Sequence, residues 1–250
     1  MMKYQNNYLS LFDKKGYFVV KDFIKNDISK KIIHETLNSK GTIKYFDRLG
    51  YPRRIEKIYN KGKHINNLNK KILKFLFNNL NEKFNMFKDK FNLKPPQGEG
   101  FFAHYDGVFI FSTKRKKNIK GWYEYDNFFV NTLIALDNCN SKNGTIELGK
   151  SDNLPFHKLI NNTKKNGTPD LKKSYEKKIQ FKKLNLKTGD MVVFKNTCPH
   201  RSGKNYTRSP RRILYFTYNL KKNGNFYKKY FLDKKISINK TQKALSGNIK

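Results

Sequence analysis

The sequence has few cysteines and no long hydrophobic run. Its two cysteines, Cys139 and Cys198, lie far apart and fit neither a disulfide framework nor the spacing of a zinc site. We interpret them as reduced thiols, which predicts a cytoplasmic protein. No stretch approaches the roughly 18 consecutive apolar residues of a membrane-spanning helix, and the first residues lack the apolar segment and cleavage site of a secretory signal. We therefore expect neither membrane insertion nor secretion.

Acidic residues are also scarce, with 19 Asp and Glu against 54 Lys and Arg, and the formal net charge is +35. Such a charge attracts phosphates, so one interpretation is a nucleic-acid or anionic membrane partner. However, lysines occur in every stretch of the chain and greatly outnumber arginine, the residue preferred for bidentate phosphate recognition. Asn, Ile, Phe and Tyr are inflated alongside lysine, as AT-rich coding would produce. We favour a compositional bias over a nucleic-acid partner and keep an anionic small substrate open.

Periodicity and turn residues divide the chain into an N-terminal part with helices and a longer part of short strands. The 250 residues, which include 21 Phe and 15 Tyr, suffice for one core. The pattern predicts a short helix from about residue 4, a strand over 17–20, a helix with Asp27 as its N-cap, and an amphipathic helix over 65–80. Strands are expected at 86–94, 100–111, 127–137, 144–149, 179–186, 190–195 and 211–219.

This order of elements predicts a mainly β barrel or sandwich with helices on its outside. We expect a single domain over residues 1–220, followed by a basic C-terminal extension over 221–250 that is peripheral or partly ordered. The stretch 150–178 has few apolar anchors and is expected to be a long surface loop, a kind of segment that often covers a site.

A histidine and an aspartate two residues apart carry the first chemical signal. His104 and Asp106 follow a β-type run, and side chains two apart on a strand point to the same face. A non-haem Fe(II) oxygenase binds its metal through two histidines and one carboxylate and leaves the remaining positions open. His200 is the natural third ligand because it follows an apolar strand at a Pro-His exit. These residues predict an iron site of His104, Asp106 and His200.

An arginine pair on the last predicted core strand carries the second signal. Arg211 and Arg212 point to opposite faces, so one of them faces the barrel interior, although alternation alone does not say which. A buried guanidinium needs an anion, and a carboxylate that accepts two hydrogen bonds is the best geometric match.

Together these residues resemble the phytanoyl-CoA dioxygenase family of Fe(II)/2-oxoglutarate oxygenases, from Gly16 to Asn219. The family's H-x-D stands as His104-Tyr105-Asp106, its distal His and Ser as His200 and Ser202, and its cosubstrate arginine, eleven residues beyond that histidine, as Arg211. Two stretches, 87–101 and 128–137, are most similar to the 2-aminoethylphosphonate dioxygenase branch. The resemblance departs at Tyr105, where the family usually has Gln, and at residues 150–153.

The resemblance implies a double-stranded β-helix (jelly-roll) barrel that uses Fe(II), 2-oxoglutarate and O2 to hydroxylate a small molecule. Its substrate could be an aminoalkylphosphonate, attacked next to phosphorus, or another small metabolite, lipid or CoA ester. A rival from another class is a basic nucleic-acid-binding protein without catalysis. Besides Arg211 and Ser202, candidate residues fall into two groups. Most of them could instead have a purely structural role, as solvated strand residues, a core amide or a core aromatic. The cosubstrate candidates are Lys94 and Asn131, and the substrate candidates are Lys90, Asn92, Tyr105 and Trp122.

Overall fold

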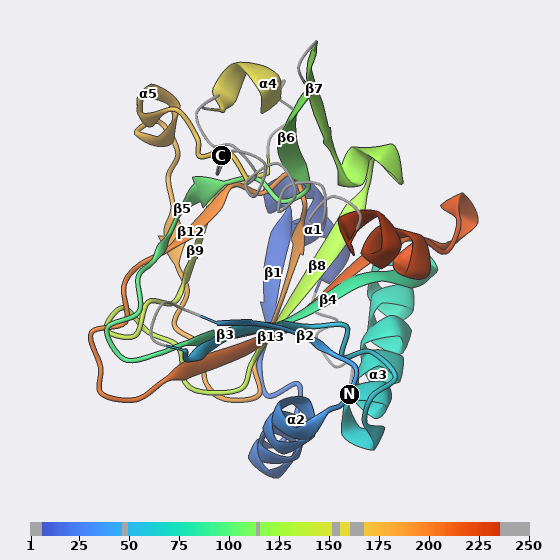
Figure 1. The fold of residues 1–250 in the computed structure, drawn as a ribbon, viewed down its shortest axis with the longest axis vertical. Coiled ribbons are helices and arrows are strands. Elements are labelled where there is room, and N and C mark those ends of the chain that lie inside the picture. Colours follow the sequence, from blue (N-terminus) through green and yellow to red (C-terminus); the bar gives the residue numbers. More distant parts are fainter. Residues whose placement is uncertain (1–6, 47–49, 114–115, 152–155, 161–167, 236–250) are drawn as a thin grey trace, which may run out of the picture.

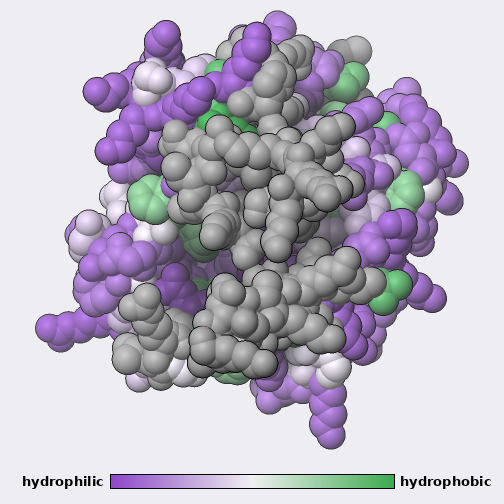
Figure 2. Space-filling view, turned by 45° about the horizontal axis from the view of Figure 1, so that its top comes forward, coloured by the Kyte–Doolittle hydropathy of each residue, from purple (hydrophilic) through white to green (hydrophobic). Residues whose placement is uncertain are grey.

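The computed structural model describes residues 7–46, 50–113, 116–151, 156–160 and 168–235 (Figure 1). Within these ranges two antiparallel sheets face each other and helices lie outside them, which is the arrangement of the predicted double-stranded β-helix. No helix in the described part of the chain is both long and apolar enough to cross a bilayer. On the face seen in Figure 2 the coloured residues are mainly hydrophilic, and the hydrophobic ones form small separate patches.

The larger sheet has seven strands in the order β1-β11-β8-β13-β4-β3-β2. Its strands are β1 (Tyr17–Val20), β2 (Ile43–Phe46), β3 (Pro52–Glu56), β4 (Phe84–Lys94), β8 (Phe129–Ala135), β11 (Met191–Lys195) and β13 (Arg211–Leu220). The long strands β4 and β13 pair along most of their length, with Arg211 opposite Lys94 and Tyr215 opposite Lys90. The hairpin of β2 and β3 has no counterpart among the strands expected from the sequence.

The smaller sheet, in the order β10-β9-β12-β5, supplies the opposite wall. Its strands are β5 (Phe101–His104), β9 (Ile146–Leu148), β10 (Lys182–Lys183) and β12 (His200–Ser202), and a separate hairpin joins β6 (Val108–Thr113) to β7 (Lys116–Gly121). The single strand expected over 100–111 is wrong, because the chain turns at Gly107. Gly107 has a φ of 85°, and a Cβ there would lie 3.0 Å from the Trp122 ring. This turn places Asp106 just beyond β5.

Helices cover the outer face of the larger sheet. They are α1 (Tyr8–Lys15), α2 (Asn26–Asn38) and α3 (Lys63–Leu80). Shorter segments elsewhere in the fold are α4 (Phe156–Leu159), α5 (Lys173–Glu176) and the 3-10 turns Trp122–Glu124 and Lys221–Asn223. The N-cap of α2 is Lys25 and not Asp27, which lies in the first turn, where its carboxylate favours the positive end of the helix dipole. The long loop expected over 150–178 contains α4 and α5, and residues 152–155 and 161–167 lie outside the described residues.

The main core fills the space between these helices and the outer face of the larger sheet. From α3, Ile65, Leu68, Ile72 and Leu76 are buried, which confirms the expected amphipathic face. They belong to one hydrophobic cluster with Leu214 and Phe216 of β13. Because strand residues alternate, the other face of β13, with Arg211, Tyr215 and Thr217, points into the barrel.

The segment after Lys221 is less peripheral than expected. Residues 227–235 are helical, and Tyr230 and Phe231 are only 7% and 6% exposed. Both belong to an aromatic cluster with Phe87, Trp122 and Phe129. Figure 1 shows this C-terminal helix, in red, beside β4. Its large aromatic side chains outweigh its many lysines, which is why composition alone was misleading. The domain boundary at residue 220 stays a prediction, and residues 236–250 lie outside the described range.

Candidate metal and cosubstrate site

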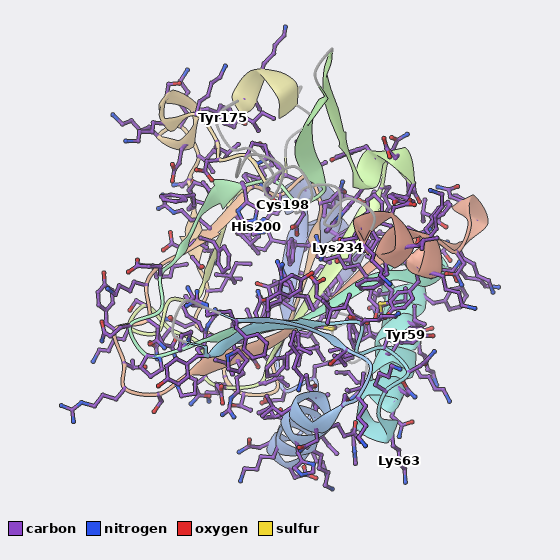
Figure 3. All side chains as sticks on the ribbon, in the orientation of Figure 1. Tyr59, Lys63, Tyr175, Cys198, His200 and Lys234 are labelled. Carbon is purple, nitrogen blue, oxygen red and sulfur yellow. The ribbon has the colours of Figure 1, made fainter. Side chains whose placement is uncertain are left out.

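The fold brings His104, Asp106 and His200 together between the two sheets. One ligand atom from each lies within 4.8 Å of the others. His104 and His200 occupy opposite positions on the paired strands β5 and β12, so their ring centroids are 4.3 Å apart. His200 Nε2 lies 3.7 Å from Asp106 Oδ2. In Figure 3 His200 lies on the inner side of the smaller sheet, toward the larger one. Two imidazoles and one carboxylate at this spacing suit a divalent first-row metal.

Hydrogen bonds to the backbone fix both histidine rings. His104 Nδ1 donates to the carbonyl of Phe102 at 2.7 Å, and His200 Nδ1 donates to the carbonyl of Cys198 at 3.1 Å. When Nδ1 carries the proton, the lone pair is on Nε2, the nitrogen left to bind a metal. Each ring is therefore held in the tautomer that a metal needs.

The charge states of the triad also favour a cation. Burial, followed by the neighbouring His200, lowers the pKa of His104 to about 3, so its imidazole is neutral at physiological pH. Burial alone would raise the pKa of Asp106, but His200 and Lys90 outweigh it and the pKa is lowered. The triad thus presents a neutral imidazole and a carboxylate without prior loss of a proton from either.

Asn131 supports the carboxylate of this triad. Its side-chain Nδ2 donates to Asp106 Oδ2 at 3.1 Å, and its Oδ1 accepts from Thr217 Oγ1 at 2.7 Å. Sequence reasoning left open whether Asn131 is a cosubstrate contact or a satisfied core amide. The structure gives its amide two partners and places it against a triad member. Thr217 was missed, although it shares a strand face with Arg211.

Arg211 is the arginine that faces the interior. It is 3% exposed, and its Nε has no hydrogen-bond partner among the residues that the structure describes. Arg212 points outward, where its Nε and Nη2 each donate to the Asp137 carboxylate at 2.7 Å. Among the described residues no carboxylate forms an ion pair with Arg211. A buried guanidinium without a counter-charge is costly, so this position suits an anion supplied by a ligand.

Lys94 lies opposite Arg211 on β4 and adds a second cation to the same place. Its Nζ donates to Ser202 Oγ at 3.0 Å, to the Gly144 carbonyl at 3.3 Å and to the Gly203 carbonyl. Burial, followed by the charge of Arg211, lowers the pKa of Lys94 to about 7. These contacts place Lys94 and Ser202 together, next to the buried arginine, and their role as cosubstrate residues stays a prediction.

The predicted substrate residues lie in different environments. Lys90 faces the interior, with its Nζ 4.6 Å from the centroid of the Tyr215 ring, and Asn92 is half-buried opposite Ile213. Tyr105, the residue that follows β5, is fully buried in a cluster with Ala103 and Val108. Trp122 is 1% exposed and packs against Phe87 and Phe129. The structure therefore places Tyr105 and Trp122 in hydrophobic clusters.

The residues present fit Fe(II) and 2-oxoglutarate. The triad offers one carboxylate and two imidazole nitrogens, and within the described ranges no carboxylate forms an ion pair with the buried Arg211 or Lys94. A ligand with a carboxylate at each end can bind the metal with one end and the guanidinium with the other.

Two known proteins are similar to this chain, and each similarity covers about half of the known protein. A methylphosphonate hydroxylase of Gimesia maris is 29% identical over 153 residues, 61% of this chain and 52% of that protein. A 2-aminoethylphosphonate dioxygenase of an uncultured bacterium is 26% identical over 164 residues, 65% of this chain and 56% of that protein. The chain thus spans about half the length of the curated relatives it matches.

Solved structures share the fold. EctD from S. alaskensis in its apoform has a TM-score of 0.67 at 16% identity and covers 88% of this chain and 78% of its own. The epimerase SnoN, solved with Fe3+, alpha ketoglutarate and nogalamycin RO, has a TM-score of 0.63 at 15% identity. The match covers 84% of this chain and 81% of SnoN. These likenesses confirm the predicted jelly-roll barrel.

A family profile covers most of the chain. The profile of the phytanoyl-CoA dioxygenase family matches residues 12–213, a span that contains the triad and Arg211. The resemblance recognised from the H-x-D, the distal histidine and the arginine is confirmed. The chain therefore belongs to the phytanoyl-CoA dioxygenase family.

Proposed function

We propose that the chain is an Fe(II)- and 2-oxoglutarate-dependent dioxygenase that hydroxylates a small phosphonate at the carbon next to phosphorus, in the first instance an aminoalkylphosphonate. The observation that carries the oxygenase assignment is a triad that could hold a metal ion together with a buried arginine whose Nε has no partner in the described part of the chain. The names of the two curated relatives, a methylphosphonate hydroxylase and a 2-aminoethylphosphonate dioxygenase, support the phosphonate.

Each residue has a defined part in this proposal. His104, Asp106 and His200 would hold the metal, and Asn131 would orient the carboxylate of Asp106 by its hydrogen bond. Arg211, assisted by Lys94, would grip the far carboxylate of 2-oxoglutarate. When bound, Fe(II) with 2-oxoglutarate and O2 supplies the oxidising chemistry of this class. The chain contributes position, charge and exclusion of water. Both cysteines are free and buried, consistent with a cytoplasmic location.

The test is anaerobic reconstitution of the protein with Fe(II) and 2-oxoglutarate, then addition of O2 with 2-aminoethylphosphonate or methylphosphonate. We expect succinate to form in proportion to hydroxylated phosphonate, and we expect His104→Ala to abolish both products. Turnover of a CoA ester, a lipid or another metabolite without turnover of any phosphonate would refute the substrate. Normal turnover by His104→Ala would refute the metal site. Tight, salt-sensitive nucleic-acid binding without decarboxylation would favour the rival class.

A further inference from the structure

Beyond the triad, the interior wall of the larger sheet carries a second group of cations. Lys88 and Lys90 lie on the same face of β4 as Lys94, and Arg54 of β3 lies opposite Asn92 of β4. At about 3.3 Å per residue, the Cα atoms of Lys88 and Lys94 are roughly 20 Å apart along the strand. The group around Lys88 is therefore separate from the pair formed by Lys94 and Arg211.

The two lysines of this group have aromatic neighbours and no acidic partner. Lys88 is 8% exposed, and its Nζ lies 4.9 Å from the centroid of the Trp122 ring. Lys90 Nζ lies 4.6 Å from the ring centroid of Tyr215. In the ranges that the structure describes, neither ammonium has a carboxylate within ion-pair distance. Asp106 is the metal-site carboxylate whose charge reaches both of them.

The carboxylate at the centre of this group, Glu56, already has several partners. It is fully buried, lies 3.3 Å from Arg54 Nε, accepts from the Tyr45 hydroxyl at 3.2 Å and forms an ion pair with Lys234. Burial alone would raise its pKa, but Lys88, Arg54 and Lys234 outweigh burial and lower the pKa to about 2. Three cationic side chains, Lys88, Arg54 and Lys234, thus act on one carboxylate, and a ligand anion would offset this excess of positive charge.

Two members of the C-terminal helix complete the group. Tyr230 is buried beside Lys88, and Lys234 reaches Glu56 from the barrel side of its helix (Figure 3). Both residues lie outside the span that the family profile matches, which ends at residue 213.

We propose that Lys88, Lys90 and Arg54 form an anion pocket for the doubly charged head group of the substrate, and that the C-terminal helix closes it through Tyr230 and Lys234. This assignment rests on the proposed function. A tetrahedral phosphonate dianion has three oxygens, and each can accept from one of the three cations. Burial, followed by the charge of Lys88, lowers the pKa of Lys90 to about 7, and a bound dianion would favour its charged form. A singly charged head group leaves more of the positive charge uncompensated.

The experiment measures ligand binding by calorimetry in the anaerobic protein loaded with Fe(II) and 2-oxoglutarate. The probes are 2-aminoethylphosphonate and its singly charged tetrahedral counterpart, 2-aminoethylsulfonate. We expect the phosphonate to bind at least about tenfold more tightly, and we expect Lys88→Met and Lys90→Met each to weaken it by about tenfold or more. Neither variant should change the affinity for 2-oxoglutarate. Lys70→Met, which removes an exposed lysine of α3, is the matched control and should change neither affinity.

Three results would overturn the pocket. The wild-type protein could bind the two probes with equal affinity, or both lysine variants could bind the phosphonate as tightly as wild type. The variants could also lose affinity for 2-oxoglutarate and keep it for the phosphonate. If the lysine variants do not fold, Arg54→Gln replaces them, since the Arg54 side chain is 38% exposed and tolerates change. The failure of the proposed function looks different. In that case the wild-type protein binds the phosphonate, the variants do not, and no succinate forms when O2 is added.

Discussion

Replacement of Arg211 by methionine separates binding of the cosubstrate from stability of the fold. Arg211 is buried and its Nε has no partner, so its guanidinium is the group left for a carboxylate of 2-oxoglutarate. Loss of one partner from a buried charge pair costs about 2–5 kcal/mol. At about 1.4 kcal/mol for each tenfold change, the affinity for 2-oxoglutarate should fall about 30- to 4000-fold.

The same substitution should stabilise the protein when 2-oxoglutarate is absent. Methionine removes a buried cation without a counter-charge, and such replacements gain about 1–4 kcal/mol in favourable cases. For a chain of this size each kcal/mol raises Tm by about 2–4 °C. The assays are anaerobic titration of the Fe(II) protein with 2-oxoglutarate, followed by its visible charge-transfer absorption, and thermal unfolding followed by circular dichroism.

Arg212→Met is the matched control, because Arg212 is the next residue and its guanidinium pairs with Asp137 on the outer face. We expect it to lower Tm and to leave the affinity for 2-oxoglutarate within about threefold of wild type. An Arg211→Met protein that binds 2-oxoglutarate as tightly as wild type would refute the assignment of Arg211. So would an Arg212→Met protein that loses the cosubstrate.

Three further predictions concern other parts of the site. Asn131→Ala removes the hydrogen bond to Asp106 and should weaken Fe(II) binding about 10- to 100-fold, as measured by competition with a chelator. Since the pKa of Lys94 is lowered to about 7, Lys94 takes up a proton when the anion binds above that pH. The affinity for 2-oxoglutarate should therefore fall as the pH rises from about 7 to about 9. A pH profile of the affinity in Lys94→Met that is as steep as that of wild type would contradict this. Glu56→Gln leaves buried cations without their carboxylate and should cost about 3–5 kcal/mol at pH 7. The pKa of Glu56 in the folded protein, about 2, lies below its value in the unfolded chain. The stabilisation by Glu56 is therefore present above about pH 4.5 and is lost as the pH falls toward 2. Measurements of Tm across that pH range test this.

The strand pattern predicted the centre of the site well. His104 and Asp106 could be paired because residues two apart share a strand face, and His200 because it ends an apolar strand. The structure brings all three together, and it settles that Arg211, and not Arg212, faces the interior. Their roles as iron and cosubstrate ligands stay predictions until binding is measured.

The sequence could not predict partners that depend on long-range packing. The link between Asn131 and Asp106 joins β8 to the turn that follows β5, and no local pattern indicates it. Arg54 and Glu56 lie in a hairpin of mixed polarity with little alternation, so their strand was missed. The helix with Tyr230 and Phe231 is hidden in a lysine-rich stretch because its burial depends on Phe87 and Trp122, which are more than 100 residues away.

The two backbone carbonyls that fix the histidine rings bear on which metal the protein acquires. The carbonyls of Phe102 and Cys198 engage both Nδ1 atoms, which leaves both Nε2 atoms as the metal-binding nitrogens. A site arranged in advance needs no folding step to load, so it offers the same nitrogens and carboxylate to every divalent ion that enters. Zn²⁺, Ni²⁺ and Cu²⁺ bind such ligands more tightly than Fe²⁺ does. We therefore expect protein isolated in air to carry these ions, and its activity to depend on metal supply during expression as much as on its sequence.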